Sequence, residues 1–345
     1  MASSDKKIYR LLAFRLSAMG DVAMTVPVVS SLLRQNPELH LTLLTNARFA
    51  PMFHGIDRLD IVGVDTKGKH SGLLGMFKLF RQVRREVKFD AFADLHDVIR
   101  AKELRLMMRL TGVPVAKIDK GRKQKDALVR DEDKQLVQLK TSVERYADVF
   151  RSLGLKVDVD FKSLFADGCQ FELPIGAKTC KWIGIAPFAQ HNGKIYPLDK
   201  MKLVVEKLQA SGAEVLLFGG GKQEKEILES WESQFQNVIS LAGKFDLLTE
   251  LKIISQCDVL VSMDSANMHL ASLVNTPVVS VWGATHPYAG FYGYGQDIKN
   301  AVQLNLPCRP CSIYGNLPCR RGNYDCLAGI KPDDVVDRVE AVLAR

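Results

Sequence analysis

The sequence predicts an α/β protein built from two halves of similar size, each with a mostly parallel sheet covered on both faces. Short apolar runs of strand length alternate with segments of helical spacing along most of the 345 residues. Residues 167–181 interrupt this alternation, because they contain Gly168, Pro174 and Gly176 and little periodic pattern. The composition, 47% hydrophobic and 25% charged, suits a chain that buries two sizeable cores.

The first half begins with an apolar run at 8–14, a loop from Arg15 to Asp21 and a helical pattern at 22–33. We expect the remaining strands of this half at 40–44, 60–64, 89–95 and 113–118. We expect its remaining helices at 73–87, 98–110 and 141–153. Residues 120–140 are strongly polar and are predicted to form a surface loop with helical pieces.

The second half repeats this alternation. We expect its strands at 182–186, 214–218, 238–241, 258–262 and 277–282. We expect its helices at 198–210, 224–235, 247–256 and 268–273, followed by a closing helix at 331–343. Polar turns follow three of the strands, and the carboxyl ends of parallel strands meet at one edge of a sheet. The turns are Pro187–Pro197, the triple glycine 219–221 and Met263–Asn267. Together they predict a nucleotide-diphosphate site without a metal.

The net charge of +8 is concentrated between Arg100 and Arg130, which contains ten Lys or Arg residues and three acids. This stretch is either a solvated surface or a contact for a polyanion such as nucleic acid, an anionic membrane or an acidic sugar phosphate. Aromatic residues are sparse in it, so platforms for stacking bases are missing and nucleic acid is the weakest of these partners. Since neither a transmembrane run nor a cleavable signal is recognised, we expect a cytosolic protein.

Several stretches together resemble glycosyltransferase family 9, the ADP-heptose:lipopolysaccharide heptosyltransferases. Asp264–Ala271 is similar to the D-[ST]-G-x-x-H-x-A motif of that family, although Ala266 stands where the family usually has glycine. A Cβ at this position would crowd a phosphate and disfavour a positive φ. The other stretches that carry the resemblance are Arg15–Val22, Lys194–Pro197, Gly283–Pro287 and the cysteine-bearing tail with Cys308, Cys311, Cys319 and Cys326.

The resemblance implies the GT-B fold, in which two Rossmann-like domains with mostly parallel sheets face a central cleft. The acceptor domain would be 1–167, the donor domain 181–330 and a C-terminal helix 331–345. It further implies an inverting, metal-independent transfer of a heptose or related sugar from an ADP-heptose-type donor to the inner core of lipopolysaccharide, with no cofactor. The membrane-anchored acceptor implies transient contact with the inner face of the inner membrane. The alternatives are a transferase for another nucleotide sugar, an epimerase of the same fold and a non-catalytic nucleotide or polyanion binder.

Two residues are the catalytic candidates that the resemblance implies. Asp21 would take the proton of the acceptor hydroxyl, since inversion needs one carboxylate opposite the leaving group. Its alternative role is to cap the first helix. Lys194 would stabilise the departing diphosphate, or it is simply a surface lysine.

The remaining candidates bind the two substrates. The donor candidates are Glu224, Asp264, Ser265, Ala266, Asn267, His269 and Thr285. Within this set, Glu224 would accept ribose hydroxyls, with Gln223 as its competitor, and His269 is either a phosphate contact or a structural histidine. The acceptor candidates are Arg15, Ser17 and Arg122.

Four of the seven cysteines, Cys308, Cys311, Cys319 and Cys326, cluster with the spacing C-x2-C-x7-C-x6-C. Four thiolates at this spacing could hold a structural zinc ion. A reducing compartment makes a disulfide framework unfavourable. We therefore favour reduced structural cysteines over a zinc site and expect no metal among the site residues.

Overall fold

The computed structural model describes residues 9–165 and 169–345, which divide into two compact units. Unit 1 contains the chain up to Lys120 together with Ser142–Phe161. Unit 2 contains Gly121–Thr141 and the chain from Lys162 onward. The domain boundary expected at residue 167 falls outside the described residues. Each unit has its own parallel sheet with helices on both faces, so the predicted α/β class is confirmed.

The sheet of unit 1 has five parallel strands in the order β3-β2-β1-β4-β5. The strands are β1 (Arg10–Phe14), β2 (His40–Thr45), β3 (Leu59–Gly63), β4 (Ala91–Asp94) and β5 (Val115–Lys117). The central strands β1 and β4 are apolar over most of their length and almost completely buried, as strands covered on both faces must be.

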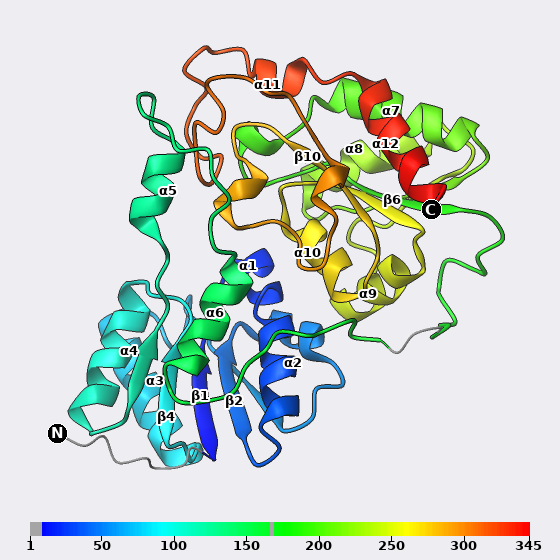
Figure 1. The fold of residues 1–345 in the computed structure, drawn as a ribbon. Helices are drawn as coiled ribbons and strands as arrows, with labels where there is room; N and C mark the ends of the chain where they lie inside the picture. Colours follow the sequence, from blue (N-terminus) through cyan, green and yellow to red (C-terminus); the bar gives the residue numbers. More distant parts are fainter. Residues whose placement is uncertain (1–8, 166–168) are drawn as a thin grey trace. The chain divides into compact units, whose positions relative to one another are not determined.

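Helices cover both faces of this sheet (Figure 1). On one face α3 (Gly72–Glu86) packs against α4 (Ile99–Leu110). On the other face α2 (Val26–Gln35) packs against α6 (Ser142–Arg151). The helix expected at 22–33 is in fact two helices, α1 (Met19–Ala23) and α2. Pro27 explains the break, because proline lacks an N–H and fits the first turn of a new helix.

The α4 side of unit 1 contains a buried ion-pair cluster that the sequence pattern did not reveal. The guanidinium of Arg105 lies 2.5 Å from a carboxylate oxygen of Asp94 and 3.2 Å from one of Asp97. The side chains of Arg105 and Asp97 are almost fully buried and that of Asp94 is fully buried. The other oxygen of Asp94 accepts the backbone N–H groups of His96 and Asp97. Arg105 therefore neutralises two acids inside the fold, although it lies in a stretch that reads as uniformly basic.

The sheet of unit 2 has six parallel strands in the order β11-β10-β9-β6-β7-β8. The strands are β6 (Trp182–Ala186), β7 (Glu214–Leu217), β8 (Val238–Ser240), β9 (Val259–Met263), β10 (Val278–Trp282) and β11 (Ala301–Gln303). The helices are α7 (Leu198–Ala210), α8 (Lys222–Glu232), α9 (Leu247–Gln256), α10 (Ala266–Leu273), α11 (Asp325–Ala328) and α12 (Pro332–Leu343). The sequence did not predict β11 or α11, which have three and four residues.

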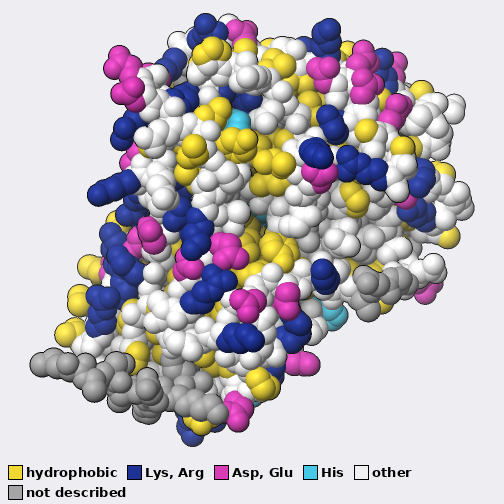
Figure 2. Space-filling view, viewed as in Figure 1, with side chains coloured by type: hydrophobic (Ala, Val, Ile, Leu, Met, Phe, Trp, Pro, Cys, Tyr) yellow, Lys and Arg dark blue, Asp and Glu magenta, His cyan; other side chains and the backbone are white. Residues whose placement is uncertain are grey.

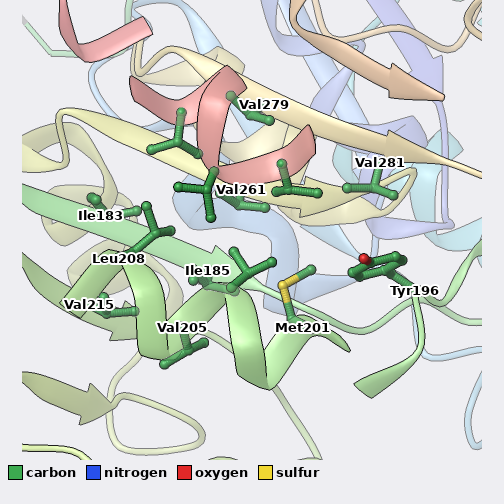
Figure 3. Close-up of a cluster of buried hydrophobic side chains, with 14 of the residues drawn as sticks. Ile183, Ile185, Tyr196, Met201, Val205, Leu208, Val215, Val261, Val279 and Val281 are labelled. Carbon is green, nitrogen blue, oxygen red and sulfur yellow. The ribbon is translucent and has the colours of Figure 1, made fainter. Parts of the chain in front are cut away.

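The core of unit 2 lies between the sheet and the helices α7 and α12, which pack against each other. Figure 3 shows Ile183 and Ile185 of β6 beside Val261 of β9, facing Val205 and Leu208 of α7. All five side chains are buried. The helices α9 and α10 also pack against each other. This core fixes the three central strands β6, β9 and β10, and thereby the loops at their carboxyl ends.

The polar piece Gly121–Thr141 carries α5 (Arg122–Leu128), in agreement with the expected loop with helical pieces. It belongs to unit 2, where Leu128 and Leu139 form a small buried cluster with Ala289 and Ile313. The backbone N–H of Leu139 donates to the carbonyl of Tyr288. This segment is therefore part of the packing of unit 2 even though it precedes α6 of unit 1 in the chain.

The buried ion-pair cluster of unit 1 predicts the effect of removing its cation. Arg105→Met would leave the carboxylates of Asp94 and Asp97 buried without their partner, so we expect unfolding in urea to show a loss of about 3–5 kcal/mol. The matched control is Arg109→Met in the last turn of the same helix, where the side chain is exposed. A change within about 0.5 kcal/mol is expected for that control. Equal effects of the two changes would show that the buried pairs contribute nothing specific.

Candidate functional site

Each sheet has one point at which the strand order reverses, and both points are lined by polar residues. In unit 2 the reversal lies between β6 and β9, and in unit 1 it lies between β1 and β4. At such a point the connections leave in opposite directions, so that a crevice opens outside the carboxyl ends of the two strands. The candidate residues Lys194 and Asp264 follow β6 and β9, and Asp21 follows β1. The geometry therefore gives one candidate site in each unit.

The site of unit 2 is centred on an ion pair. The ammonium of Lys194 lies 2.9 Å from a carboxylate oxygen of Asp264, and both side chains are largely buried. Lys194 ends a short 3-10 helix, η2 (Asn192–Lys194), and Asp264 directly follows β9. The structure therefore brings together two residues that are 70 positions apart and that the sequence assigned to different loops. An ammonium held in this way keeps donor hydrogens for a further anion, since it carries three.

The loop after β10 packs tightly against the loop that carries Lys194. The backbone N–H of Ala284 donates to the carbonyl of Gly193 at 2.8 Å. A Cβ on Gly283 would lie 2.6 Å from this same carbonyl oxygen, so only glycine permits the contact. The side chain of Lys194 lies against Gly315, where a Cβ would be 2.6 Å from its Cγ. Close backbone packing on two sides thus fixes the position of the lysine.

Arg309 ties the same loop to the edge of the sheet. Its guanidinium donates to the carbonyls of Gly283 at 2.5 Å and Thr285 at 2.9 Å, to the carbonyl of Leu304 and to the side-chain oxygen of Gln303 at 3.0 Å. The side chain is buried, and burial lowers the pKa of Arg309 from its usual value. The sequence pattern pointed only to the neighbouring cysteines and missed this arginine. No local signal distinguishes it from an exposed arginine.

The remaining donor candidates lie at the start of α10 and beside it. Ser265 is the N-cap residue, and Ala266 and Asn267 are the first two helical residues. Ala266 lies within the α-helix, so the expected conflict between its Cβ and a positive φ does not arise. His269 lies in the first turns of α10 and is buried. Four candidates within five consecutive residues thus lie around one helix start.

Thr285 lies in the loop after β10, and Glu224 lies just after the triple-glycine loop. The hydroxyl of Thr285 is buried and has no hydrogen-bond partner among the described residues. Such a group is costly to leave unsatisfied, so it is a natural position for a ligand contact. Glu224 lies in the first turn of α8, and its carboxylate accepts the backbone N–H of Gly220 at 2.7 Å. Glu224 therefore fixes the triple-glycine loop that precedes it.

The site of unit 1 is built around an ion pair between Arg15 and Asp21. Their closest side-chain atoms are 2.6 Å apart, and Arg15 is buried, whereas 33% of the Asp21 side chain remains exposed. Arg15 also donates to the carbonyl of Leu95 at 2.9 Å and stacks over the ring of Tyr146. Asp21 accepts the backbone N–H of Ala18 at 3.2 Å, so the capping role and an accessible carboxylate exist together. Ser17 is exposed in the same loop.

His96 is a polar residue of this site that the sequence reasoning did not select. It follows β4, is buried and lies with its ring centroid 6.1 Å from that of Phe14. Burial, together with the nearby charges of Arg15 and Lys120, lowers the pKa of His96 to about 3, so the ring is neutral at pH 7. Its Nδ1 atom has no hydrogen-bond partner among the described residues. The signal that could have found it is the polar run Asp94–Asp97 directly after a buried strand.

The basic stretch Arg100–Arg130 is not one surface. Its α4 part belongs to unit 1, and Arg105 in that part is buried in ion pairs. The acceptor candidate Arg122 begins α5 and belongs to unit 2. Lys125 of the same helix is buried and lies 4.2 Å above the ring of Phe291. The charge excess therefore divides between two units and partly serves packing.

The four clustered cysteines are free thiols. Within the described residues no three His, Cys, Asp or Glu side chains are grouped so that they could hold a metal ion. Cys326 belongs to the core of unit 2, and burial raises its pKa to about 11. Burial likewise raises the pKa of Cys311. These two thiols are therefore protonated at neutral pH and act as small packing groups.

Comparisons with known proteins show the family and the fold of the chain. A sequence model of glycosyltransferase family 9 (heptosyltransferase) matches residues 76–317. Lipopolysaccharide heptosyltransferase 3 of Escherichia coli is 26% identical over 280 residues, which cover 77% of this chain and 81% of that protein. A family 9 glycosyltransferase structure from Veillonella parvula has a TM-score of 0.75 at 19% identity and covers 99% of both chains. The E. coli heptosyltransferase WaaC with ADP-2-deoxy-2-fluoro heptose has a TM-score of 0.68 at 19% identity and covers 96% of this chain and 99% of WaaC.

The two parallel sheets and the structural similarities define the GT-B fold. The match of the family model over most of the sequence identifies the chain more narrowly. This protein belongs to glycosyltransferase family 9, the heptosyltransferase family. The fold, the enzyme class and the family predicted from the sequence are confirmed.

The contacts of Arg309 predict a large effect of its removal. Arg309→Met would leave the carbonyls of Gly283, Thr285 and Leu304 without their charged donor, so we expect unfolding of unit 2 to become easier by at least about 2 kcal/mol. Urea unfolding followed by tryptophan fluorescence measures this, because Trp182, Trp231 and Trp282 are all in unit 2. The control is Arg321→Met, an exposed arginine in the same C-terminal region. If Arg309→Met unfolds like that control, the loop does not depend on the guanidinium.

Proposed function

We propose that this protein transfers a heptose, or a related sugar, from an ADP-heptose-type donor to the inner core of lipopolysaccharide. The transfer inverts the anomeric carbon and needs no metal ion. The observation that carries the proposal is the buried Lys194–Asp264 pair at the reversal point of unit 2, beside the start of α10. The heptosyltransferase relatives and the ADP-sugar analogue named with WaaC support the donor class.

In this mechanism unit 2 receives the donor diphosphate. Lys194 provides a positive charge that Asp264 keeps in place, and the backbone N–H groups at the start of α10 provide aligned donors. As the glycosidic bond to the diphosphate breaks, the growing negative charge on the leaving oxygen meets a charge that is already oriented. The further donor contacts in the proposal are Glu224, Asp264, Ser265, Ala266, Asn267, His269 and Thr285.

Unit 1 receives the acceptor and supplies the base. The exposed part of the Asp21 carboxylate takes the proton of the acceptor hydroxyl while that oxygen attacks the anomeric carbon. Arg15 fixes the carboxylate and remains positively charged throughout, so it is a positioning residue for the base. In addition to Arg15, the proposed acceptor contacts are Ser17 of unit 1 and Arg122, which begins α5 in unit 2. Because the pKa of His96 is lowered to about 3, its ring is a weak base and adds no positive charge to this site at pH 7.

The proposal includes a place of action. No helix among residues 9–165 and 169–345 is both long and apolar enough to cross a bilayer. Since a lipopolysaccharide precursor is anchored in a membrane, we propose a cytoplasmic enzyme that contacts the inner face of the inner membrane transiently. Nucleic acid is not a partner in this proposal.

The base assignment is tested with Asp21→Asn, which keeps the shape of the side chain and removes its basicity. We expect the transfer rate to fall by about 10²–10⁴. Binding of ADP should remain, because the donor is assigned to unit 2, and a thermal shift with excess ADP measures this binding. Transfer at the wild-type rate would refute the base assignment.

The nucleotide comparison in the same experiment tests the donor class. ADP should raise the melting temperature, whereas GDP and UDP should not. A shift with GDP or UDP alone would mean a transferase for another nucleotide sugar. A shift with ADP without any transfer by the wild-type protein would favour a non-catalytic nucleotide binder.

The charge assignment is tested with Lys194→Gln. Since its ammonium is assigned to the leaving diphosphate, we expect the transfer rate to fall by about 10²–10³ and ADP binding to weaken. Lys222→Gln at the exposed start of α8 is the matched control and should leave both quantities unchanged. A variant at Lys194 that retains its rate would show that this lysine only neutralises Asp264.

A further inference from the structure

The outer surface of α3 and α4 exposes large apolar side chains to solvent. Six of them lie on these two helices, whereas the rest of described unit 1 contributes one, Tyr9. The six, with the exposed fraction of each, are Leu73 (70%), Leu74 (78%), Phe77 (49%), Ile99 (75%), Leu106 (60%) and Leu110 (79%). Elsewhere among the described residues no large apolar side chain exceeds 55%. This concentration on two adjacent helices differs from the single exposed apolar residues of an ordinary surface.

The same surface is basic. Between the apolar side chains α3 and α4 expose seven cations, namely Lys78, Arg81, Arg84, Arg85, Arg100, Lys102 and Arg109. The one exposed acid on these helices, Glu86, pairs with Arg85. Figure 2 shows hydrophobic and basic side chains next to each other along the left edge of the molecule, where α4 lies in Figure 1. We call these thirteen side chains the α3–α4 face.

Helical spacing explains why the α3–α4 face is separate from the core. Ile99, Lys102, Leu106 and Leu110 follow one another at intervals of three or four residues and so form one stripe along α4. Residues on the opposite side of the two helices, such as Met76, Leu79, Leu104 and Met108, are buried against the sheet. The exposed apolar residues are therefore not required to complete the core of unit 1.

We infer that the α3–α4 face docks unit 1 onto an anionic membrane surface. This inference rests on the membrane association within the proposed function and names the surface responsible. Apolar side chains enter the boundary between headgroups and acyl chains, while lysine and arginine remain at the level of the lipid phosphates. Helices that lie flat on a membrane combine these two residue classes in this way.

The cations and the apolar side chains of the α3–α4 face together favour an anionic lipid surface over a second copy of the chain or nucleic acid. A second copy of the chain would bring seven further cations against the same seven, and this like-charge contact is unfavourable. Nucleic acid would match the cations but would leave the six apolar side chains without a partner. An anionic lipid surface matches both sets.

Vesicle sedimentation of the full chain, without substrates, tests the inference. Vesicles of phosphatidylethanolamine and phosphatidylglycerol in roughly three-to-one proportion should bind the protein, whereas phosphatidylcholine vesicles should bind it much less. The charge variant Lys78→Gln/Arg81→Gln/Lys102→Gln/Arg109→Gln should lose roughly five-fold in affinity per charge, which is about six-hundred-fold for the four charges. The apolar variant Leu74→Ser/Leu106→Ser/Leu110→Ser should lose at least about ten-fold and retain the salt dependence of the wild type.

Two controls keep the test specific. Leu203→Ser/Ile298→Ser removes exposed apolar side chains of unit 2, and Lys222→Gln/Lys225→Gln removes exposed cations of α8; both should bind vesicles like the wild type. Unchanged circular dichroism and melting temperature establish that the face variants are folded. Transfer to a deacylated, water-soluble acceptor should be the same in the face variants as in the wild type. If instead the proposed function is wrong, the wild type and all variants show no transfer, while their vesicle binding is as described above.

Three outcomes would overturn the inference. One is a wild-type protein that does not sediment with the anionic vesicles at low salt. Another is vesicle binding that the face variants retain in full. The third is a wild-type oligomer in sedimentation velocity that becomes monomeric in the apolar variant, because the face would then bind a second copy of the chain.

Discussion

Burial of the central strands on both faces is the constraint on which the rest of this structure depends. Strands β1, β4, β6, β9 and β10 have almost no exposed residue, and their charged residues lie only at strand ends. Because all of them are parallel, their carboxyl ends meet at one edge in each unit. Asp94 is the last residue of β4, and Asp21 and Asp264 lie beyond the ends of β1 and β9. The apolar cores thus determine where the chemistry of the enzyme can be placed.

Both sites share a second principle, which is that a charged residue is fixed by an opposite charge before any substrate arrives. Lys194 is held by Asp264 in unit 2, and Asp21 is held by Arg15 in unit 1. In each pair one partner is more accessible than the other. Pairing reduces the side-chain freedom that would otherwise be lost when the substrate binds. Arg309 and the close glycine contacts extend this rigidity to the loop after β10.

The sequence predicted most of the elements, because periodicity reflects burial directly. Strand β6 and helices α7 and α9 have the expected bounds, whereas α3 is shifted by one residue and α4 begins one residue later than expected. What periodicity did not predict depends on contacts between distant residues. Arg105 and Arg309 read as ordinary basic residues, and only tertiary packing places one beside two carboxylates and the other beside three carbonyls. The family resemblance and the strand ends predicted that Lys194 and Asp264 both belong to the donor site. Only the structure shows that their side chains form an ion pair. Ala266 shows the opposite error in its backbone, since a disfavoured positive φ was expected where the residue is helical.

The segment Gly121–Thr141 belongs to unit 2, although the chain on both sides of it belongs to unit 1. The chain crosses between the units at three places, before Gly121, after Thr141 and after Phe161. Neither unit is therefore a continuous fragment, and no single cut in the gene yields one of them whole. A fragment that began at Lys162 would lack Leu128 and Leu139, which cover Ala289 and Ile313. Exchange of one complete unit between related chains would accordingly require the replacement of two separate segments.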